Sequence, residues 1–192
     1  MNNLPVMKIY RTELDGVCLL RPDVFKDERG MFLESYNRER HRQNGLEHDW
    51  VQDNLSSSRH GVVRGLHYQL GPHAQSKIVQ AVWGLILDVV VDIRKGSPTF
   101  GRHVAVELDS EERVQILIPR GFAHGFSVLS ESAVVMYKTD DYYHKASESG
   151  IRYDDPGLGI DWRIPADQRV VSSKDLELPL FSQLNTNFEY GG

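Results

Sequence analysis

Apolar and polar residues alternate most regularly in the segment LILDVVVDIR, residues 85–94. Its odd-numbered positions are all apolar, whereas Asp88, Asp92 and Arg94 stand at even-numbered positions. Successive side chains of a β-strand point to opposite faces, so this alternation predicts a strand with one apolar face and one largely polar face. The polar face is suited to line a cavity.

Similar short runs, separated by turns that contain glycine, proline and serine, continue from Gly61 to Tyr143. Further strands are predicted at residues 77–82, 101–108, 114–118, 125–129 and 133–138. This pattern is typical of an antiparallel sandwich or barrel. Helices are predicted only at the flanks, in NRERHRQNG with Asn37 as N-cap and Gly45 as stop, and in SSKDLELP with a serine cap and a terminating proline.

The length and composition predict one mainly-β domain over residues 1–192. A chain of 192 residues that is 40% hydrophobic can bury one core, and nothing in its length requires a second. The net charge of -5 argues against nucleic-acid binding, which needs a clustered excess of lysine and arginine. An anionic ligand must therefore meet a local basic cluster.

The cysteine content and the apolar runs predict a cytoplasmic protein with no membrane role. Cys18 is the single cysteine and has no partner for an internal disulfide, and the segment MNNLPVMKIY lacks the apolar core of a secretory signal. The longest apolar runs are interrupted by aspartates and fall well short of the roughly 20 residues that span a bilayer.

Two glycine-containing strips each carry a histidine beside apolar strands. They are GVVRGLHYQ with His67 and IPRGFAHGF with His124, and both resemble the paired motifs of the cupin superfamily, whose fold is a jelly-roll barrel. Packing alone would favour leucine or valine at such positions. His73 is undecided, and the remaining histidines are expected to be ordinary surface or hydrogen-bonded residues: His41, His48, His60, His103 and His144.

The cupin resemblance also bears on metal binding. In metal-binding cupins four motif positions supply ligands, and the resemblance assigns these positions to His67, Gln69, Lys77 and His124. A protonated lysine has no lone pair and repels a divalent cation. We therefore expect no metal, and no other cofactor is implied.

A closer resemblance covers nearly the whole chain in order. The strips that carry it are DERGMFLESY, VQDNLSSSRHGVVRGLHYQ, AQSKIVQAVWG, DVVVDIRKGSPTFG, IPRGFAHGFSVLS, YKTDDYY, GIRYDDPGLGIDW and SSKD. All of them resemble the dTDP-4-dehydrorhamnose 3,5-epimerase family. The resemblance implies an isomerase that inverts carbons 3 and 5 of dTDP-4-dehydro-6-deoxy-D-glucose, giving dTDP-4-dehydro-L-rhamnose without a metal or a redox cofactor.

The resemblance assigns roles that fit this chemistry. A hydrogen beside a ketone is weakly acidic, so its removal needs a base near neutral pKa and a positive group at the enolate oxygen. His67 fits the base, because an ordinary histidine has a pKa of about 6.5. Lys77 fits the enolate clamp. Tyr137 matches the family's acid, which must deliver a proton from the opposite face of the sugar.

A base histidine needs an acceptor for its second nitrogen, so that the free nitrogen points at the substrate. Asp175 in SSKD matches the family's partner for this role. From the sequence alone, Asp88 and Asp92 are rivals on the polar face of a strand, and Asp175 fits equally well the first turn of a helix. Only the resemblance selects Asp175.

The resemblance also implies a set of substrate-binding residues, while no glycine-rich phosphate loop is present in the sequence. These residues are Arg29, Glu34, Gln52, Asp53, Asn54, Arg64, Lys77, His124, Glu148 and Lys174. Tyr142 and Tyr143 are weaker candidates for packing near the sugar or base. In the family, the strip RGMFLES contacts a neighbouring subunit, which implies a homodimer.

Three alternative functions remain open from the sequence. Relatives with much the same histidine and tyrosine invert only one carbon or shift the ketone along the ring. A metal-dependent cupin enzyme would hold a transition metal at His67 and His124. A non-catalytic module would bind dTDP-sugars without turnover.

Overall fold

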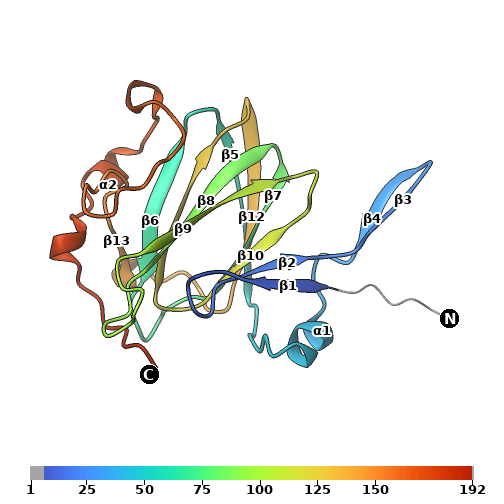
Figure 1. Cartoon of the computed structure of the whole chain (residues 1–192), viewed down its shortest axis with the longest axis horizontal. Coiled ribbons are helices and arrows are strands. Elements are labelled where there is room, and N and C mark those ends of the chain that lie inside the picture. The colour runs from blue at the N-terminus through green and yellow to red at the C-terminus, as the bar shows by residue number, and fades with distance from the viewer. Residues whose placement is uncertain (1–6, 192) are drawn as a thin grey trace.

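The computed structural model describes residues 7–191, which form two antiparallel β-sheets and a separate hairpin (Figure 1). The first sheet has the order β1 (Lys8–Arg11), β2 (Cys18–Arg21), β10 (Gln115–Ile118), β7 (Lys77–Trp83), β12 (Ser132–Thr139) and β5 (Gln52–Arg59). The second has the order β13 (Glu148–Gly150), β6 (Val63–Gln69), β11 (Phe122–Val128), β8 (Leu85–Asp92) and β9 (His103–Asp109). The mainly-β prediction is confirmed.

The predicted strands agree with the structure to within two residues at most boundaries. The exception is β11, which begins at Phe122, three residues before the predicted start at Gly125. The sequence analysis did not identify β5, whose segment QDNLSSSR contains one apolar residue. As an edge strand whose inner face is polar, β5 lacks the hydrophobic alternation that marks a half-buried strand.

The core between the sheets explains the two faces of β8. Ile86 and Val90, at even-numbered positions, pack in the cluster between the two sheets. Val89 and its odd-numbered neighbours pack on the outer side with Trp162 of the C-terminal segment. Both faces of β8 are therefore buried, and the predicted polar face of this strand is the one that looks into the barrel.

Both predicted helices are present and begin at the predicted caps. In α1 (Arg38–Gln43) the Asn37 side chain accepts a hydrogen bond from the Arg40 amide. In α2 (Ser173–Leu176) the Ser172 side chain accepts from the Asp175 amide. Short 3₁₀ turns occur at η1 (Lys145–Ser147), η2 (Ala166–Gln168) and η3 (Phe181–Gln183). In the described part of the chain, no helix has the length and apolar content needed to cross a membrane.

A β-bulge interrupts the pairing of β6 with β11 and determines which face the functional side chains of β6 point to. His67 pairs with His124, but the next pair along the strands is Arg64 with Phe126, so one residue more is used on β6 than on β11. A bulge of this kind reverses the alternation of faces in one strand. Arg64 and His67 therefore face the same side of the sheet although they are three residues apart.

Glycine is required where the bulge brings the two strands together. Gly65 has φ of +117°, and a Cβ at this position would lie 2.7 Å from the Cα of Gly125. A Cβ on Gly125 would in turn lie 2.5 Å from the Arg64 carbonyl oxygen. Neither contact is possible for a side chain, which explains the two glycines beside the histidines in the motifs.

The hairpin of β3 (Val24–Asp27) and β4 (Gly30–Leu33) projects away from both sheets (Figure 1). Its two strands pair only with each other among the described strands. Phe32 is 67% exposed, and Phe25 and Met31 are also exposed. A projecting hairpin with an apolar surface lacks, within one chain, the packing that normally stabilises such residues.

Candidate active site

A cavity of about 160 Å³ opens between the two sheets at one end of the barrel. Three of the four predicted catalytic side chains line it: His67 from β6, Lys77 from β7 and Tyr137 from β12. The other lining residues are Gln52, Asn54, Tyr68, Gln69, Gln75, Tyr143 and Glu148. The structure thus gathers residues that are far apart in the sequence around one space.

His67 is held by Asp175, which α2 brings against β6. Its Nε2 lies 2.8 Å from Asp175 Oδ1, and Asp175 Oδ2 accepts a hydrogen bond from the Gly65 amide at 3.1 Å. Burial acts to raise the pKa of Asp175, but the hydrogen bonds from His67 and from Gly65 outweigh burial and hold that pKa below its ordinary value. With Nε2 occupied, Nδ1 is the nitrogen left for a ligand.

The two rival aspartates have other partners. Asp88 Oδ2 lies 2.8 Å from His124 Nε2. Asp92 accepts hydrogen bonds from Arg94, Ser97 and Thr99, which fixes the loop after β8. Among the three candidates, Asp175 is therefore the one that contacts His67.

Lys77 lies in the cavity wall with its pKa lowered to about 8. Burial is the main cause of the lowering, and the negative charges of Asp88 and Glu148 oppose it. The ammonium form still predominates at neutral pH. Lys77 therefore presents a positive charge, weakly solvated, to whatever occupies the cavity.

Tyr137 stands on the sheet that faces His67. Its ring packs against the core cluster, and its hydroxyl makes no hydrogen bond to any residue of the described chain. Burial raises the pKa of Tyr137, with the nearby Arg64 charge acting in the opposite direction. The phenol therefore keeps its proton at neutral pH and can donate it.

Several predicted binding residues form a hydrogen-bonded rim. Glu148 accepts from the Lys174 ammonium at 2.5 Å and from the Tyr143 hydroxyl at 2.7 Å. The Tyr143 amide donates to Gln52, whose own amide donates to Asn54. Burial acts to raise the pKa of Glu148, but the contacts with Lys174 and Tyr143 hold it below its ordinary value. The rim is therefore polar and charged, as an anionic ligand with hydrogen-bonding groups requires.

Arg64 and His124 lie beside the cavity. Arg64 is exposed, faces the same side as His67 and donates from Nε to the buried Ser58 hydroxyl at 3.1 Å. His124 is paired with His67 across β6 and β11, so the two rings share the inner face of the sheet. Its Nε2 is taken by Asp88, which leaves Nδ1 for other contacts.

Asp53 does not join Gln52 and Asn54 in the cavity. In the pairing of β5 with β12, Asn54 lies opposite Tyr137, and Asp53 lies opposite Lys138. Neighbouring residues of a strand point to opposite faces, so Asp53 is on the outer face, where it forms an ion pair of 2.8 Å with Lys138. Asp53 therefore lies outside this cavity, and its contact with the nucleotide stays a prediction.

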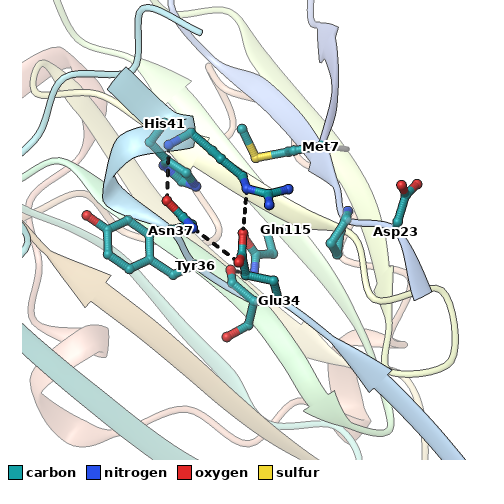
Figure 2. A pocket seen from close by; sticks show the side chains of 10 residues that line it. Met7, Asp23, Glu34, Tyr36, Asn37, His41 and Gln115 are labelled. Atoms are coloured by element: carbon teal, nitrogen blue, oxygen red, sulfur yellow. Dashed lines mark hydrogen bonds and ion pairs between the residues drawn. The ribbon is translucent and has the colours of Figure 1, made fainter. Parts of the chain in front are cut away.

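Arg29 and Glu34 also lie outside this cavity in the single chain. Arg29 is at the tip of the projecting hairpin, 85% exposed and paired with Asp27. Glu34 lines a separate small cavity beneath α1, where it binds Arg40 Nε at 3.0 Å and the Asn37 amide at 3.1 Å (Figure 2). Neither residue meets His67 within one chain.

Two residues that were not predicted as catalytic or substrate-binding hold parts of the site in place by hydrogen bonds. Gln69 accepts from the His144 amide at 2.7 Å and donates to the His73 carbonyl at 2.6 Å, which fixes the loop that carries Tyr143. Ser58 fixes Arg64. The position of Gln69, two residues after His67 and on the same face, is the signal that identifies it. The sequence holds no comparable signal for Ser58.

The fold and the site define a class of protein. This is a cupin-type barrel enzyme whose cavity holds a carboxylate-bound imidazole, a half-buried ammonium and, from the opposite sheet, a neutral phenol. A base, a cation and an acid in this arrangement are suited to proton transfer at carbon beside a carbonyl group. Within the described chain, no group of three or more histidine, cysteine or acidic residues is arranged to hold a metal ion.

Comparisons with known proteins give the family. The family model described as dTDP-4-dehydrorhamnose 3,5-epimerase matches residues 11–183. The enzyme of that name from Shigella flexneri is 48% identical over 171 residues, which cover 88% of this chain and 93% of that protein. This chain therefore belongs to the dTDP-4-dehydrorhamnose 3,5-epimerase family, whose members are isomerases.

Solved structures agree in fold. The epimerase of Elizabethkingia anophelis is 47% identical with a TM-score of 0.89, and the match covers 93% of this chain and 98% of that one. The Legionella pneumophila enzyme, solved in complex with dTDP-4-keto-L-rhamnose, is 45% identical with a TM-score of 0.90, and the match covers 94% and 95% of the two chains. The predicted cupin-type jelly roll is confirmed.

Proposed function

We propose that this protein converts dTDP-4-dehydro-6-deoxy-D-glucose to dTDP-4-dehydro-L-rhamnose by inverting carbons 3 and 5. The observation that carries the proposal is the His67–Asp175 pair, which faces a cavity shared with Lys77 and Tyr137. Family membership supplies the substrate, and the cavity supplies the groups that its chemistry needs.

The first step is proton removal beside the C4 ketone. His67 Nδ1 takes the proton from carbon, and the electron pair moves to the ketone oxygen to form an enolate. Asp175 holds the ring orientation and stabilises the imidazolium that forms. General base catalysis contributes about 10²–10⁴-fold, which leaves much of the barrier for charge stabilisation. The Lys77 ammonium stabilises the enolate oxygen, and one such preorganised donor contributes roughly 3–4 kcal/mol.

The second step is proton delivery to the other face of the same carbon. The Tyr137 phenol donates its proton to carbon, the enolate returns to the ketone, solvent reprotonates the phenolate, and the His67 imidazolium releases its proton to solvent. His67 and Tyr137 come from opposing sheets, so a sugar ring between them offers a different face to each. The same two steps at the second carbon complete the double inversion.

The rim holds the nucleotide. The guanidinium of Arg64 and the ammonium of Lys174 supply positive charge for the diphosphate, and charge-assisted hydrogen bonds of this kind are among the stronger ones. Gln52, Asn54 and Glu148 offer hydrogen-bonding groups for the sugars and the base. Tyr143 presents an exposed ring at the cavity mouth.

The decisive experiment incubates the 4-keto-6-deoxyglucose substrate with the protein in heavy water and follows each carbon by NMR. Deuterium at both carbons 3 and 5, with inversion at both, supports the proposal. Incorporation at one carbon identifies a mono-epimerase instead. Binding of the nucleotide sugar without any incorporation would leave a non-catalytic module and remove carbon-acid chemistry.

The homodimer belongs to the same proposal. We assign the exposed Phe32 surface of the β3–β4 hairpin to a second copy of the chain, where Arg29 and Glu34 would meet the partner's cavity. We also place the protein in the cytoplasm, supported by Cys18 as a buried free thiol whose pKa burial raises to about 11.

Mixed dimers test this contribution. Arg29→Ala and His67→Ala are each expected to be inactive alone. Mixed together under exchange conditions, half of the dimers are hybrids and each hybrid has one intact site, so activity returns to about a quarter of the wild-type level. No recovery in hybrids verified by mass spectrometry would place Arg29 outside the partner's site.

A further inference from the structure

Asp88 is a buried charge that the proposed reaction leaves without a task. It is 0% exposed on the inner face of β8, between the apolar Ile86 and Val90. One carboxylate oxygen contacts His124, but the other, Oδ1, is buried and has no hydrogen-bond partner among the described residues. A buried carboxylate oxygen without a partner is costly, so packing alone does not explain the choice of residue.

The position of Asp88 links it to the catalytic groups. His124, which it contacts, is paired across the strands with His67. On the other side, the charge of Asp88 is the first of two that favour the ammonium form of Lys77 against burial. Asp88 therefore lies beneath the cavity, in contact with one histidine of the inner face and within electrostatic reach of the lysine.

We propose that Asp88 is a positioning residue for this reaction: its carboxylate is the counter-ion that keeps Lys77 charged in the cavity wall, and it fixes the ring of His124. The proposal rests on the proposed function, because it assigns Lys77 to the enolate. It accounts for the free Oδ1, which is the oxygen left to face the ammonium once His124 occupies Oδ2.

Other groups around Lys77 are less suited to this role. On the strands paired with β7, Ile118 and Thr139 stand opposite Lys77 and carry no charge. The titratable and charged groups that face the same end of the barrel are Asp88 on β8, Glu148 on β13, Arg64, His67 and Tyr68 on β6, His124 on β11, Tyr137 on β12 and Tyr143 after β12. Glu148 already pairs with Lys174 and Tyr143 at the rim, which leaves Asp88 as the acidic group with an unoccupied oxygen.

The direction of the effect follows from electrostatics. A neighbouring negative charge favours the protonated lysine, so removing it lowers the pKa of Lys77 further below its value of about 8. The rate falls when pH rises through this pKa, because a neutral amine no longer stabilises the enolate. Loss of the Asp88 charge therefore moves the basic limb of the kcat profile to lower pH.

The test compares Asp88→Asn with Asp92→Asn. Both aspartates are completely buried on β8, but Asp92 binds Arg94, Ser97 and Thr99 and not the cavity residues. The midpoint of Lys77 titration is measured by NMR of the lysine ε-carbon, assigned with Lys77→Arg. In Asp88→Asn we expect a midpoint lower by about one unit or more, and kcat at pH 8 lower by about fivefold or more. Asp92→Asn should leave the midpoint unchanged.

An unchanged Lys77 midpoint in folded Asp88→Asn would overturn the proposal, as would an equal shift in both variants. A second measurement uses the wild-type protein in case Asp88→Asn does not fold. The side-chain carboxyl carbon of Asp88 should show a step in its NMR shift at the Lys77 midpoint, and Lys77→Met should abolish that step. Absence of the step in the wild-type protein also overturns the proposal.

These titrations need no substrate, so they separate two failures. If the Lys77 shifts are as expected but no epimerisation occurs, the counter-ion proposal stands and the proposed function is wrong. If the protein is an active epimerase without the shifts, the proposed function stands and the counter-ion proposal is wrong. In the active enzyme, a positioning role also predicts that Asp88→Asn lowers kcat much more than it raises KM.

Discussion

Two imidazole–carboxylate pairs lie side by side in the barrel, and they differ mainly in access. In each pair a histidine Nε2 lies 2.8 Å from a carboxylate oxygen. The His67 side chain is 33% exposed at the cavity, whereas that of His124 is 9% exposed. The carboxylate of His67 arrives on a helix 108 residues away, but that of His124 comes from the neighbouring strand. The same contact distance is thus assigned, in our proposal, to a base in one pair and to a support in the other.

The largest expected effect on activity comes from the His67–Asp175 pair, the exposed pair of the two. His67→Ala removes the base, so both deuterium exchange and epimerisation should fall by about 10³-fold or more. His124→Ala should keep measurable exchange, because this ring does not act on carbon. Both rates are measured by NMR in heavy water. Measurable exchange in His67→Ala would remove His67 as the base, and equal losses in the two variants would erase the difference between the pairs.

The next effect concerns the carboxylate of the exposed pair. Asp175→Asn leaves the shape but removes the charge that orients the imidazole and stabilises the imidazolium, so kcat should fall by about 10²-fold with little change in KM. Glu177→Gln, at the end of the same helix, is the matched control and should keep wild-type kcat. A wild-type kcat in folded Asp175→Asn would show that His67 needs no partner.

Tyr137→Phe separates exchange from inversion. The His67 side of the cavity is intact in this variant, so exchange should persist within about tenfold of wild type while inversion falls by about 10²-fold. The two rates are read from the same NMR spectra. Equal loss of both would mean that Tyr137 acts before the proton leaves carbon, and not as the acid on the second face.

A smaller effect is expected in stability against pH. Because the pKa of Asp175 is held below its ordinary value in the folded state, the pair contributes stability above the unfolded pKa, and this contribution is lost as pH falls through the folded pKa. Asp175→Asn should therefore be less stable than wild type at pH 7, by about 1–2 kcal/mol, and approach it in acid. Urea unfolding from pH 3 to pH 7 measures this difference. If the difference in unfolding free energy between the two proteins stays constant with pH, the lowered pKa of Asp175 is contradicted.

No effect is expected from metal removal. Lys77 stands at the position where metal-binding cupins supply a ligand, so the exposed pair should work without an ion. Activity should survive dialysis against chelators, and elemental analysis should find no stoichiometric iron, nickel or zinc. A loss of activity that added metal restores would favour a metal-dependent cupin at His67 and His124.

The sequence predicted most of the site wherever a single strand or motif carries the information. His67, Lys77 and Tyr137 lie on β6, β7 and β12, inside the motifs that carry the family resemblance, and those motifs identified them. Asp175 was selected only by resemblance, because a contact across 108 residues leaves no local pattern and Asp88 fitted the same role. Long-range pairing is decided by tertiary packing, which residue spacing does not encode.

Other predicted residues lie away from the cavity, and one strand was not identified, each for its own physical reason. Asp53 was grouped with its neighbours although the period of a strand places it on the outer face with Lys138. The strand β5 was missed because its inner face is polar. Arg29 and Glu34 lie away from His67 within one chain, and we assign their role to the proposed second copy, which the structure of a single chain does not contain.

The close approach of Gly65 to Gly125 has a consequence for the evolvability of this enzyme. The two main chains lie in direct contact there, so neither position tolerates a new side chain. The facing wall, built by β5 and β12, carries no such restriction at Gln52 or Asn54. Adaptation to other nucleotide sugars should therefore accumulate at Gln52 and Asn54, and a library confined to these two positions should yield altered preferences without loss of the proton-transfer machinery.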